Sequence, residues 1–240
     1  MGEIVLITGG SRGIGFETAA ALGRSGATVI VTGRSARSVE PAAAALADEG
    51  IDIDSAILDV TSYPDVVRLA EAVRTRHGRL DVLVNNAGVA GEWTFPGGEY
   101  VDPRAAQITL DTNVLGVLHM VEAFLPLLRR SAAGRIVNVS SYMGSLAIQA
   151  GAGADDLVVP AYQASKAALN SITLTLSKSL AGTAISVTSV DPGFVQTDFS
   201  PINRAQAPLT AAQGAEPVVR AAAGGPASGS FIGRDGELPW

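Results

Sequence analysis

Two short patterns in the chain carry residue types that could do chemistry. Residues 8–15 are Thr-Gly-Gly-Ser-Arg-Gly-Ile-Gly, and residues 162–166 are Tyr-Gln-Ala-Ser-Lys. Glycines between a strand and a helix let the backbone approach a pyrophosphate, which the amino end of the helix then stabilises. The first pattern therefore predicts a dinucleotide site. In the second, a phenol and an ammonium group share one helix face, which by itself is equally typical of an ordinary polar pair on an amphipathic helix.

The glycine pattern has two alternative interpretations. It could be a plain turn between a strand and a helix, and residues 9–13 also match the G-x-S-x-G elbow that holds the nucleophile of hydrolases. A hydrolase needs a later His as base and an oxyanion donor from an earlier strand loop. Only eight residues precede Gly9, and both histidines, His77 and His119, fall within expected helices. Dinucleotide binding is therefore favoured.

The residues after the second expected strand indicate the type of dinucleotide. They are Gly33-Arg34-Ser35, and no acidic residue lies between Thr28 and Val39. An NAD-binding turn usually places an acid here for the ribose hydroxyls, whereas an Arg suits the 2′-phosphate of NADP. Arg12 and Arg37 could also face that phosphate. NADP is favoured over NAD, although Arg34 could be an ordinary solvated charge and the strictness of the preference stays open.

The elements that must position these residues follow from the hydrophobic pattern. Short β-branched runs alternate with Ala/Leu-rich stretches along the whole chain. The expected strands are 4–8, 28–32, 53–60, 80–84, 135–139, 185–190 and 230–232. The expected helices are 13–24, 38–49, 62–76 with Ser62 as its cap, 103–129, 161–181 and 211–223. Apolar strands alternating with helices predict one α/β domain over residues 1–240, a doubly wound (Rossmann) parallel sheet of about seven strands with helices on both faces.

Polar segments follow the third to sixth expected strands. They are Asp59-Val60, residues 85–88, Ser140-Ser141 and residues 191–193. Because the carboxyl ends of parallel strands meet at one edge of a sheet, these segments should converge there. The two longest loops, residues 89–102 and 142–160, belong to the same edge. Long loops at this edge are typical of ligand-binding sites.

Composition excludes several classes of protein. The 240 residues have 23 Asp+Glu against 17 Lys+Arg, a net charge of −6, two His and no Cys, and 47% are hydrophobic. The apolar content excludes disorder, and the acidic balance argues against a nucleic-acid partner. Lack of Cys excludes disulfides and thiolate sites, and two isolated His make a metal site improbable. With no targeting signal and no apolar run of about 18 residues, we expect a cytoplasmic protein without a membrane partner.

Taken in order, the motifs resemble the short-chain dehydrogenase/reductase family over essentially the whole chain. The matching segments are T-G-x-x-x-G-x-G at 8–15, N-N-A-G at 85–88, Asn113 in a helix, Ser141 at a strand end, Y-x-x-x-K at 162–166, and P-G-x-x-x-T at 192–197. The chain is most similar to the carbonyl-reductase branch. The grounds are Arg12, the turn Thr32-Gly33-Arg34, the enlarged loop before Tyr162, and the tail over residues 230–240.

The resemblance implies a catalytic set of Asn113, Ser141, Tyr162 and Lys166. Tyr162 would donate a proton to a carbonyl oxygen while NADPH supplies hydride to the carbon. Lys166 and the positive nicotinamide would lower the phenol pKa from its ordinary value of about 10, and Lys166 would also hold the nicotinamide ribose. Ser141 would hydrogen-bond the carbonyl, in preference to Ser140, because the family places the catalytic Ser second. Asn113 would position a water of the proton relay.

The resemblance also implies a set of cofactor-binding residues. Asp59 and Val60 would contact the adenine, residues 86–88 its ribose, and Thr197 the carboxamide. The full set is Gly9, Ser11, Arg12, Gly13, Ile14, Gly15, Arg34, Asp59, Val60, Asn86, Ala87, Gly88, Tyr162, Lys166, Pro192, Gly193, Val195 and Thr197. NADP(H) is the implied cofactor, and no metal is expected.

The predicted function is NADPH-dependent reduction of aldehyde and ketone carbonyls to alcohols. A small apolar molecule is the expected substrate, because five apolar residues lie on loops bordering the site: Trp93, Phe95, Met143, Ile148 and Phe199. Two alternatives stay open. One is an NADP-dependent alcohol or polyketide-type dehydrogenase, and the other is a catalytically idle NADP-binding regulatory protein.

One departure from compact family members concerns the loop before Tyr162. Ser141 and Tyr162 are 21 residues apart, so residues 149–156 must loop out for the two hydroxyls to meet. Asp155 and Asp156 within it suggest a solvated turn rather than a metal site. In related carbonyl reductases an enlarged loop here accompanies monomers, so a monomer and a homo-oligomer are both open.

Overall fold

An eight-stranded sheet forms the centre of the computed structural model, which describes residues 2–151 and 157–240. The strand order is β3-β2-β1-β4-β5-β6-β7-β8. The strands are β1 Ile4–Ile7, β2 Thr28–Gly33, β3 Ile53–Ile57, β4 Val82–Asn85, β5 Gly134–Val139, β6 Ile185–Val190, β7 Phe231–Gly233 and β8 Gly236–Glu237. The first seven are parallel and β8 is antiparallel to β7. The doubly wound α/β prediction is confirmed, with eight strands instead of about seven, since the two-residue β8 is too short for a periodic signal.

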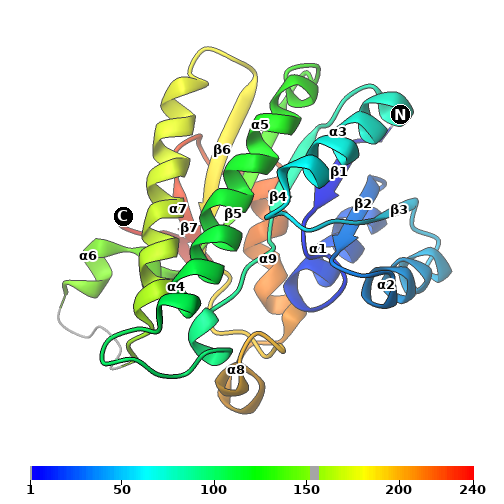
Figure 1. Cartoon of the computed structure of the whole chain (residues 1–240). Helices are drawn as coiled ribbons and strands as arrows, with labels where there is room; N and C mark the ends of the chain where they lie inside the picture. Colours follow the sequence, from blue (N-terminus) through cyan, green and yellow to red (C-terminus); the bar gives the residue numbers. More distant parts are fainter. Residues whose placement is uncertain (1, 152–156) are drawn as a thin grey trace.

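Helices cover both faces of this sheet. They are α1 Gly13–Arg24, α2 Ala36–Asp48, α3 Tyr63–His77, α4 Pro103–Leu110, α5 Gly116–Leu128, α6 Leu146–Gln149, α7 Pro160–Ser179, α8 Pro201–Gln206 and α9 Ala211–Ala222. One apolar cluster joins the sheet to α3, α5 and α7, and a second joins it to α1, α2 and α9. Figure 1 shows α3, α5 and α7 side by side along one face.

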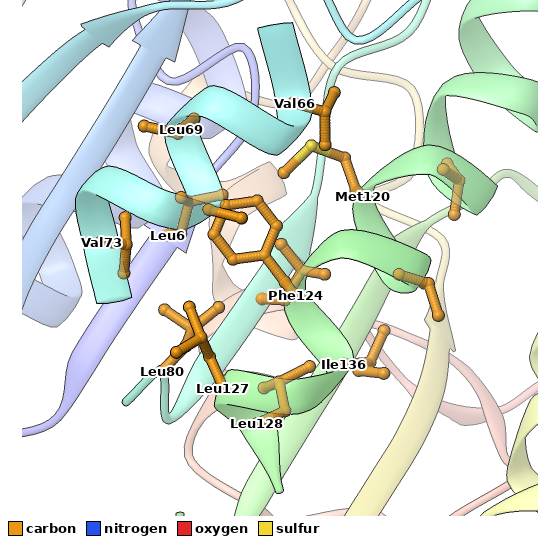
Figure 2. Close-up of a cluster of buried hydrophobic side chains, with 14 of the residues drawn as sticks. Leu6, Val66, Leu69, Val73, Leu80, Met120, Phe124, Leu127, Leu128 and Ile136 are labelled. Atoms are coloured by element: carbon orange, nitrogen blue, oxygen red, sulfur yellow. The ribbon is translucent and has the colours of Figure 1, made fainter. Parts of the chain in front are cut away.

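The core on the α5 side is built around one aromatic ring. Phe124 of α5 is fully buried and lies among Leu6 of β1, Leu80 before β4 and Val66 of α3 (Figure 2). Burying each such side chain contributes roughly 1.5–3 kcal/mol to folding. This packing fixes α5, and with it the segment before α5, against the strands whose ends form the site.

The helix expected over residues 103–129 contains an irregular segment. Between α4 and α5 the structure has a π-helical stretch, Asp111–Leu115, which includes Asn113. Single π turns inside α-helices are frequent at functional sites. The span Pro103–Leu128 contains an 18-residue window of mean hydropathy 1.3 and is long and apolar enough to cross a membrane by length and composition, so the expectation of no such run is wrong by that criterion. Core helices meet the same criterion, and Met120 and Phe124 of this span are fully buried against the sheet.

Several element boundaries differ from the sequence expectation. Strand β3 ends at Ile57 rather than at residue 60, so Asp59 and Val60 lie in the loop after it. Ser62 occupies the position before α3, but its side chain makes no capping hydrogen bond. The helices α6 and α8 and the 3₁₀ turns Gly91–Trp93 and Tyr142–Gly144 were not expected. They are too short for their apolar period to be recognised.

Candidate active site

The polar strand ends converge on one cleft, as their positions predict. Its volume is about 1780 Å³, and it runs along the carboxyl edge of the parallel strands. The lining comes from the glycine turn, the ends of β2 to β6, the amino end of α7, and the segment that leads into α8. Every residue expected to bind the cofactor lines this cleft, and so do Ser141, Tyr162 and Lys166. Asn113 and Arg37 are not among its lining residues.

The glycine turn has the backbone shape that close ligand approach requires. Gly9 and Gly13 have φ of +65° and +58°, a region that other residues rarely adopt. Asn86 clamps the turn, because its Nδ2 donates to the carbonyl oxygens of Thr8 at 2.9 Å and Gly9 at 3.1 Å. A Cβ on Gly15 would lie 2.5 Å from Asn86 Nδ2. The turn therefore leaves no room for side chains on its inner surface.

The histidines that a hydrolase would need are engaged elsewhere. His77 Nε2 lies 3.1 Å from Asp54 Oδ2, and His119 Nδ1 lies 3.0 Å from the carbonyl oxygen of Val60. Neither lines the cleft. The serine of the G-x-S-x-G match, Ser11, therefore has no histidine base among the residues that the structure describes at this site.

One end of the cleft gathers cations and hydroxyls. Arg34 lines it together with Ser11, Ser35 and Ser38. Arg12 lines the same region and lies 3.6 Å from Asp198, in an exposed ion pair. Guanidinium and hydroxyl donors are suited to a phosphate group, and no ion pair of Arg34 is present among the described residues. This end of the cleft therefore offers positively charged and hydroxyl donors to an anionic group.

At the other end, Ser141 and Tyr162 meet although they are 21 positions apart in the sequence. The Ser141 hydroxyl hydrogen-bonds the Tyr162 phenol, so the two side chains meet as expected. Lys166, one turn along α7 and buried, donates from Nζ to the carbonyl oxygen of Val139 at 2.8 Å. Its Nζ lies 5.5 Å from the centre of the Tyr162 ring. The centre of the Phe199 ring lies 5.4 Å from that of the Tyr162 ring.

The electrostatics of Tyr162 differ from the expectation. Burial raises the pKa of the phenol well above its ordinary value, the Asp191 carboxylate raises it further, and the Ser141 hydrogen bond opposes them. Burial also lowers the pKa of Lys166 to about 8, against the influence of Asp191. In the protein chain by itself the Tyr162 pKa is thus raised, and its lowering by Lys166 together with the positive nicotinamide stays a prediction for the complex. The chain holds Tyr162 as a neutral phenol, the form that can donate a proton.

Asp191 was part of a polar segment in the sequence, but no role was assigned to it. It follows β6, and its Oδ1 accepts a hydrogen bond from the backbone N–H of Gly193 at 3.2 Å. A second hydrogen bond comes from the backbone of Tyr142, next to Ser141. Burial raises the pKa of this carboxyl group, and Lys166 lowers it. An acid directly before Pro-Gly at a strand end was the signal available in the sequence.

Asn113 has a different environment from the other three expected catalytic residues. Its side chain is buried, with Nδ2 donating to the Val89 carbonyl oxygen at 2.8 Å and to Ser165 Oγ at 2.9 Å. Its Oδ1 accepts from the N–H of Val89 at 2.9 Å. The amide thus connects the loop after β4 to α7. Positioning of a water by Asn113 stays a prediction.

Glu92 belongs to the site although the sequence analysis missed it. Its Oε1 accepts hydrogen bonds from the backbone N–H groups of Ala161 at 2.8 Å and Tyr162 at 3.1 Å. The carboxylate therefore caps the helix that carries Tyr162, from a position 70 residues earlier in the chain. Such a distant capping residue leaves no local pattern in the sequence.

The apolar border of the cleft matches the expectation in part. Trp93, Met143 and Phe199 line it, together with four residues that were not expected: Leu157, Val159, Phe194 and Ile202. Phe95 and Ile148 do not line it, so their prediction is wrong. The ring of Phe95 packs under the guanidinium of Arg104 at 4.6 Å, and Ile148 lies in α6.

Two further expectations concern the loop and metals. Most of the expected loop over 149–156, including Asp155 and Asp156, lies outside the described residues. Within residues 2–151 and 157–240, no group of three or more His, Asp or Glu side chains could hold a metal ion.

The parallel sheet and the glycine-lined cleft at its carboxyl edge define a dinucleotide-binding protein of the Rossmann type. The family model for short chain dehydrogenase matches residues 3–207, and the chain therefore belongs to that family of oxidoreductases. A relative from Pseudomonas aeruginosa, a 3-oxoacyl-(acyl-carrier-protein) reductase, is 33% identical over 202 residues, which are 83% of this chain and 76% of the relative.

Two solved structures have the same fold. Salutaridine reductase from Papaver somniferum superposes with a TM-score of 0.81 and 30% identity, covering 96% of this chain and 99% of that one. A variant of actinorhodin polyketide ketoreductase, solved with NADPH, has a TM-score of 0.81 and 27% identity, covering 97% of this chain and 95% of that one.

Proposed function

We propose that this protein uses NADPH to reduce the carbonyl group of small apolar ketones and aldehydes to alcohols. One observation carries the proposal. The hydrogen-bonded pair Ser141 and Tyr162, with Lys166 one helical turn away, lies in the same cleft as the glycine turn and Arg34. A proton donor and a dinucleotide site are thus brought within one cavity.

The residues of the chain have separate tasks in this reaction. The Ser141 hydroxyl hydrogen-bonds the carbonyl oxygen and holds it near the Tyr162 phenol. Tyr162, kept neutral by burial and by Asp191, gives its proton to that oxygen as negative charge develops there. NADPH, when bound, supplies the hydride that adds to the carbonyl carbon. Lys166 would hold the nicotinamide ribose, and its ammonium would stabilise the phenolate that is left after the proton has been transferred.

The residues at the other end of the cleft fit NADP(H) better than NAD(H). Arg34, Arg12 and the nearby hydroxyls supply donors for a 2′-phosphate, and β2 ends without an acid that would bind unphosphorylated ribose. A Cβ on the glycines of the turn would occupy the space at the start of α1. Because the glycines lack one, that space is available to a pyrophosphate. The NADPH found with the actinorhodin polyketide ketoreductase variant gives independent support.

The substrate end of the cleft favours neutral, apolar molecules. Its wall contains aromatic and aliphatic side chains from three segments of the chain: Trp93, Met143, Leu157, Phe194, Phe199 and Ile202. Apolar walls with a few placed polar groups are typical of sites for small organic ligands. We propose cytoplasmic activity by the single unit of residues 1–240, with either a monomer or a homo-oligomer as the working form.

Loss of NADPH absorbance with a panel of activated ketones and aldehydes tests the proposal. We expect turnover with apolar carbonyls and slower turnover with charged ones of the same size. Binding of NADPH without turnover across the panel would instead favour the idle regulatory alternative. Turnover confined to the oxidation of alcohols would favour the dehydrogenase alternative.

A further inference from the structure

The amino end of α7 is capped by a residue from a distant loop. Val159 stands at the capping position of α7 and offers no side-chain acceptor. Glu92 supplies one, because its Oε1 accepts from the N–H groups of Ala161 and Tyr162 at 2.8 and 3.1 Å. Unsatisfied N–H groups and the helix dipole both favour a carboxylate at this point. The hydrogen bond to the N–H of Tyr162 fixes the backbone of the proposed proton donor directly.

The segment that carries Glu92 is itself firmly held. Both the N–H and the carbonyl oxygen of Val89 bond the side chain of Asn113, at 2.9 and 2.8 Å. The N–H of Gly91 donates to Thr109 Oγ1 at 2.9 Å. A Cβ on Gly91 would lie 2.3 Å from the Ala105 carbonyl oxygen, so the segment packs directly on α4. Because this loop is held in place, the hydrogen bond from the Tyr162 N–H to Glu92 holds the Tyr162 backbone in place as well.

This loop also forms part of the cleft. Gly88, Ala90 and Trp93 line it on either side of Glu92 in the sequence. Gly88 belongs to the expected cofactor contacts, and Trp93 lies in the apolar wall. One short segment, residues 88–93, thus contributes to the expected cofactor contacts, to the apolar border of the cleft and to the cap of α7.

The second carboxylate oxygen of Glu92 needs a separate explanation. Glu92 Oε2 is buried and has no hydrogen-bond partner among the described residues. Burying a carboxylate oxygen without a partner is costly. A structural cap could be provided by Ser, Thr or Asn without that cost. Glu92 instead places a negative charge where it acts on the Tyr162 phenol and raises its pKa.

We propose that Glu92 is a positioning residue for proton transfer. It fixes the backbone of Tyr162 so that the phenol meets both Ser141 and the carbonyl oxygen, and its charge favours the neutral phenol. This inference rests on the proposed function, since it takes Tyr162 as the proton donor. Glu92 itself touches neither substrate nor cofactor.

Two substitutions at residue 92 separate the geometric effect from the charge. Glu92→Ala removes the acceptor, and we expect kcat for ketone reduction to fall about 10- to 100-fold, because small displacements of a reacting group are costly. The Kd for NADPH, measured by fluorescence titration, should change less than about twofold, since the glycine turn and Arg34 are untouched. Glu92→Gln keeps an acceptor for both N–H groups and should restore kcat to within about threefold of wild type.

The pH profile of alcohol oxidation by Glu92→Gln measures the effect of the Glu92 charge on Tyr162. Besides Glu92, the groups that act on Tyr162 are Asp191 after β6, Ser141 and Tyr142 after β5, and Lys166 on α7. Glu92 raises the phenol pKa, so its neutralisation lowers that pKa. Alcohol oxidation needs the phenolate. The alkaline rise of the oxidation rate should therefore move to lower pH in Glu92→Gln, a shift that loss of a purely structural cap does not produce.

Asp102→Ala is the matched control for loss of a carboxylate cap. Asp102 caps α4 through a hydrogen bond from the N–H of Arg104 at 2.8 Å and does not line the cleft. We expect a similar decrease in Tm for Asp102→Ala and Glu92→Ala. In Asp102→Ala kcat should be unchanged, whereas in Glu92→Ala it should fall. Circular dichroism at the assay temperature establishes that each variant is folded.

The outcomes distinguish failure of this inference from failure of the proposed function. No turnover by the wild type, or full turnover by Tyr162→Phe, overturns the proposed function. An inactive Tyr162→Phe together with kcat within twofold of wild type in Glu92→Ala overturns the role of Glu92 alone. If Glu92→Ala does not fold, Glu92→Gln decides, and an unshifted or more alkaline oxidation profile overturns the inference.

Discussion

The two ends of the cleft differ in whether backbone or side chains form them. The cofactor end consists largely of backbone, with Gly9, Gly13 and Gly15 within one continuous segment and Asn86 clamping it. The catalytic end consists of side chains from segments far apart in the chain, among which Ser141 and Lys166 are buried.

This difference decides what each end responds to. At the cofactor end, function depends on the absence of side chains and on exposed cations, so added volume or reversed charge should matter most. At the catalytic end, ionisable groups lie in an environment of low polarity, where a single charge shifts its neighbours. Substitutions that keep volume but change protonation should therefore act there and not at the cofactor end.

The largest expected effect comes from Tyr162→Phe, which deletes only the hydroxyl at the catalytic end. General acid catalysis is typically worth about 10²- to 10⁴-fold, so kcat for ketone reduction should fall by that factor. NADPH affinity, measured by fluorescence titration, should be unchanged. A variant that keeps more than a tenth of the wild-type kcat would show that proton transfer does not depend on Tyr162.

Arg34→Asp reverses a charge at the cofactor end. A lost charge-assisted hydrogen bond costs about 1.5–3 kcal/mol, or roughly 10- to 150-fold in kcat/KM for NADPH. The value for NADH should change little, because NADH lacks the 2′-phosphate. Arg37→Asp is the matched control, since Arg37 lies on the same turn region but does not line the cleft. Equal losses in both variants would indicate a general effect of surface charge.

Gly15→Ala tests whether cofactor binding depends on the lack of a side chain in the glycine turn. The added Cβ would lie 2.5 Å from Asn86 Nδ2 and 2.6 Å from the Gly9 carbonyl oxygen, so the clamp must shift. We expect the free energy of unfolding to fall by about 1–3 kcal/mol and NADPH binding to weaken. In Gly225→Ala the nearest atoms, Arg220 Cγ and the Arg220 carbonyl oxygen, are both 3.3 Å away, so only a small adjustment is needed. Chemical denaturation should show a change within about 0.5 kcal/mol there. Equal stability of the two variants would contradict this account.

Asp191→Asn has the smallest expected effect, and it is purely electrostatic. The amide oxygen can still accept from the backbone N–H of Gly193, while the charge that raises the Tyr162 pKa is removed. The phenol pKa should fall, and the pH dependence of alcohol oxidation should move to lower pH by up to about one unit. A profile that moves to higher pH would mean that loss of Asp191 acts mainly through Lys166.

The sequence by itself determined the parallel sheet and its convergent strand ends, and the family resemblance supplied the expected cofactor contacts, which all line the cleft. These features depend on interactions that are local in the chain. Apolar runs set the strands, glycines set the turn, and the handedness of crossovers then brings the strand ends together. The spacing of Tyr162 and Lys166 is likewise a property of one helix. For this reason each of these residues could be placed before any long-range contact was known.

Only the tertiary structure decided what surrounds Tyr162. Glu92 reaches it across 70 residues, and Asp191 acts on it from another strand. Neither interaction leaves a periodic or local signal. In the chain by itself the Tyr162 pKa is raised, because burial contributes most to the shift. Burial is a property of the packed chain, so the same phenol and ammonium on the same helix face can be shifted either way by the elements that close over them.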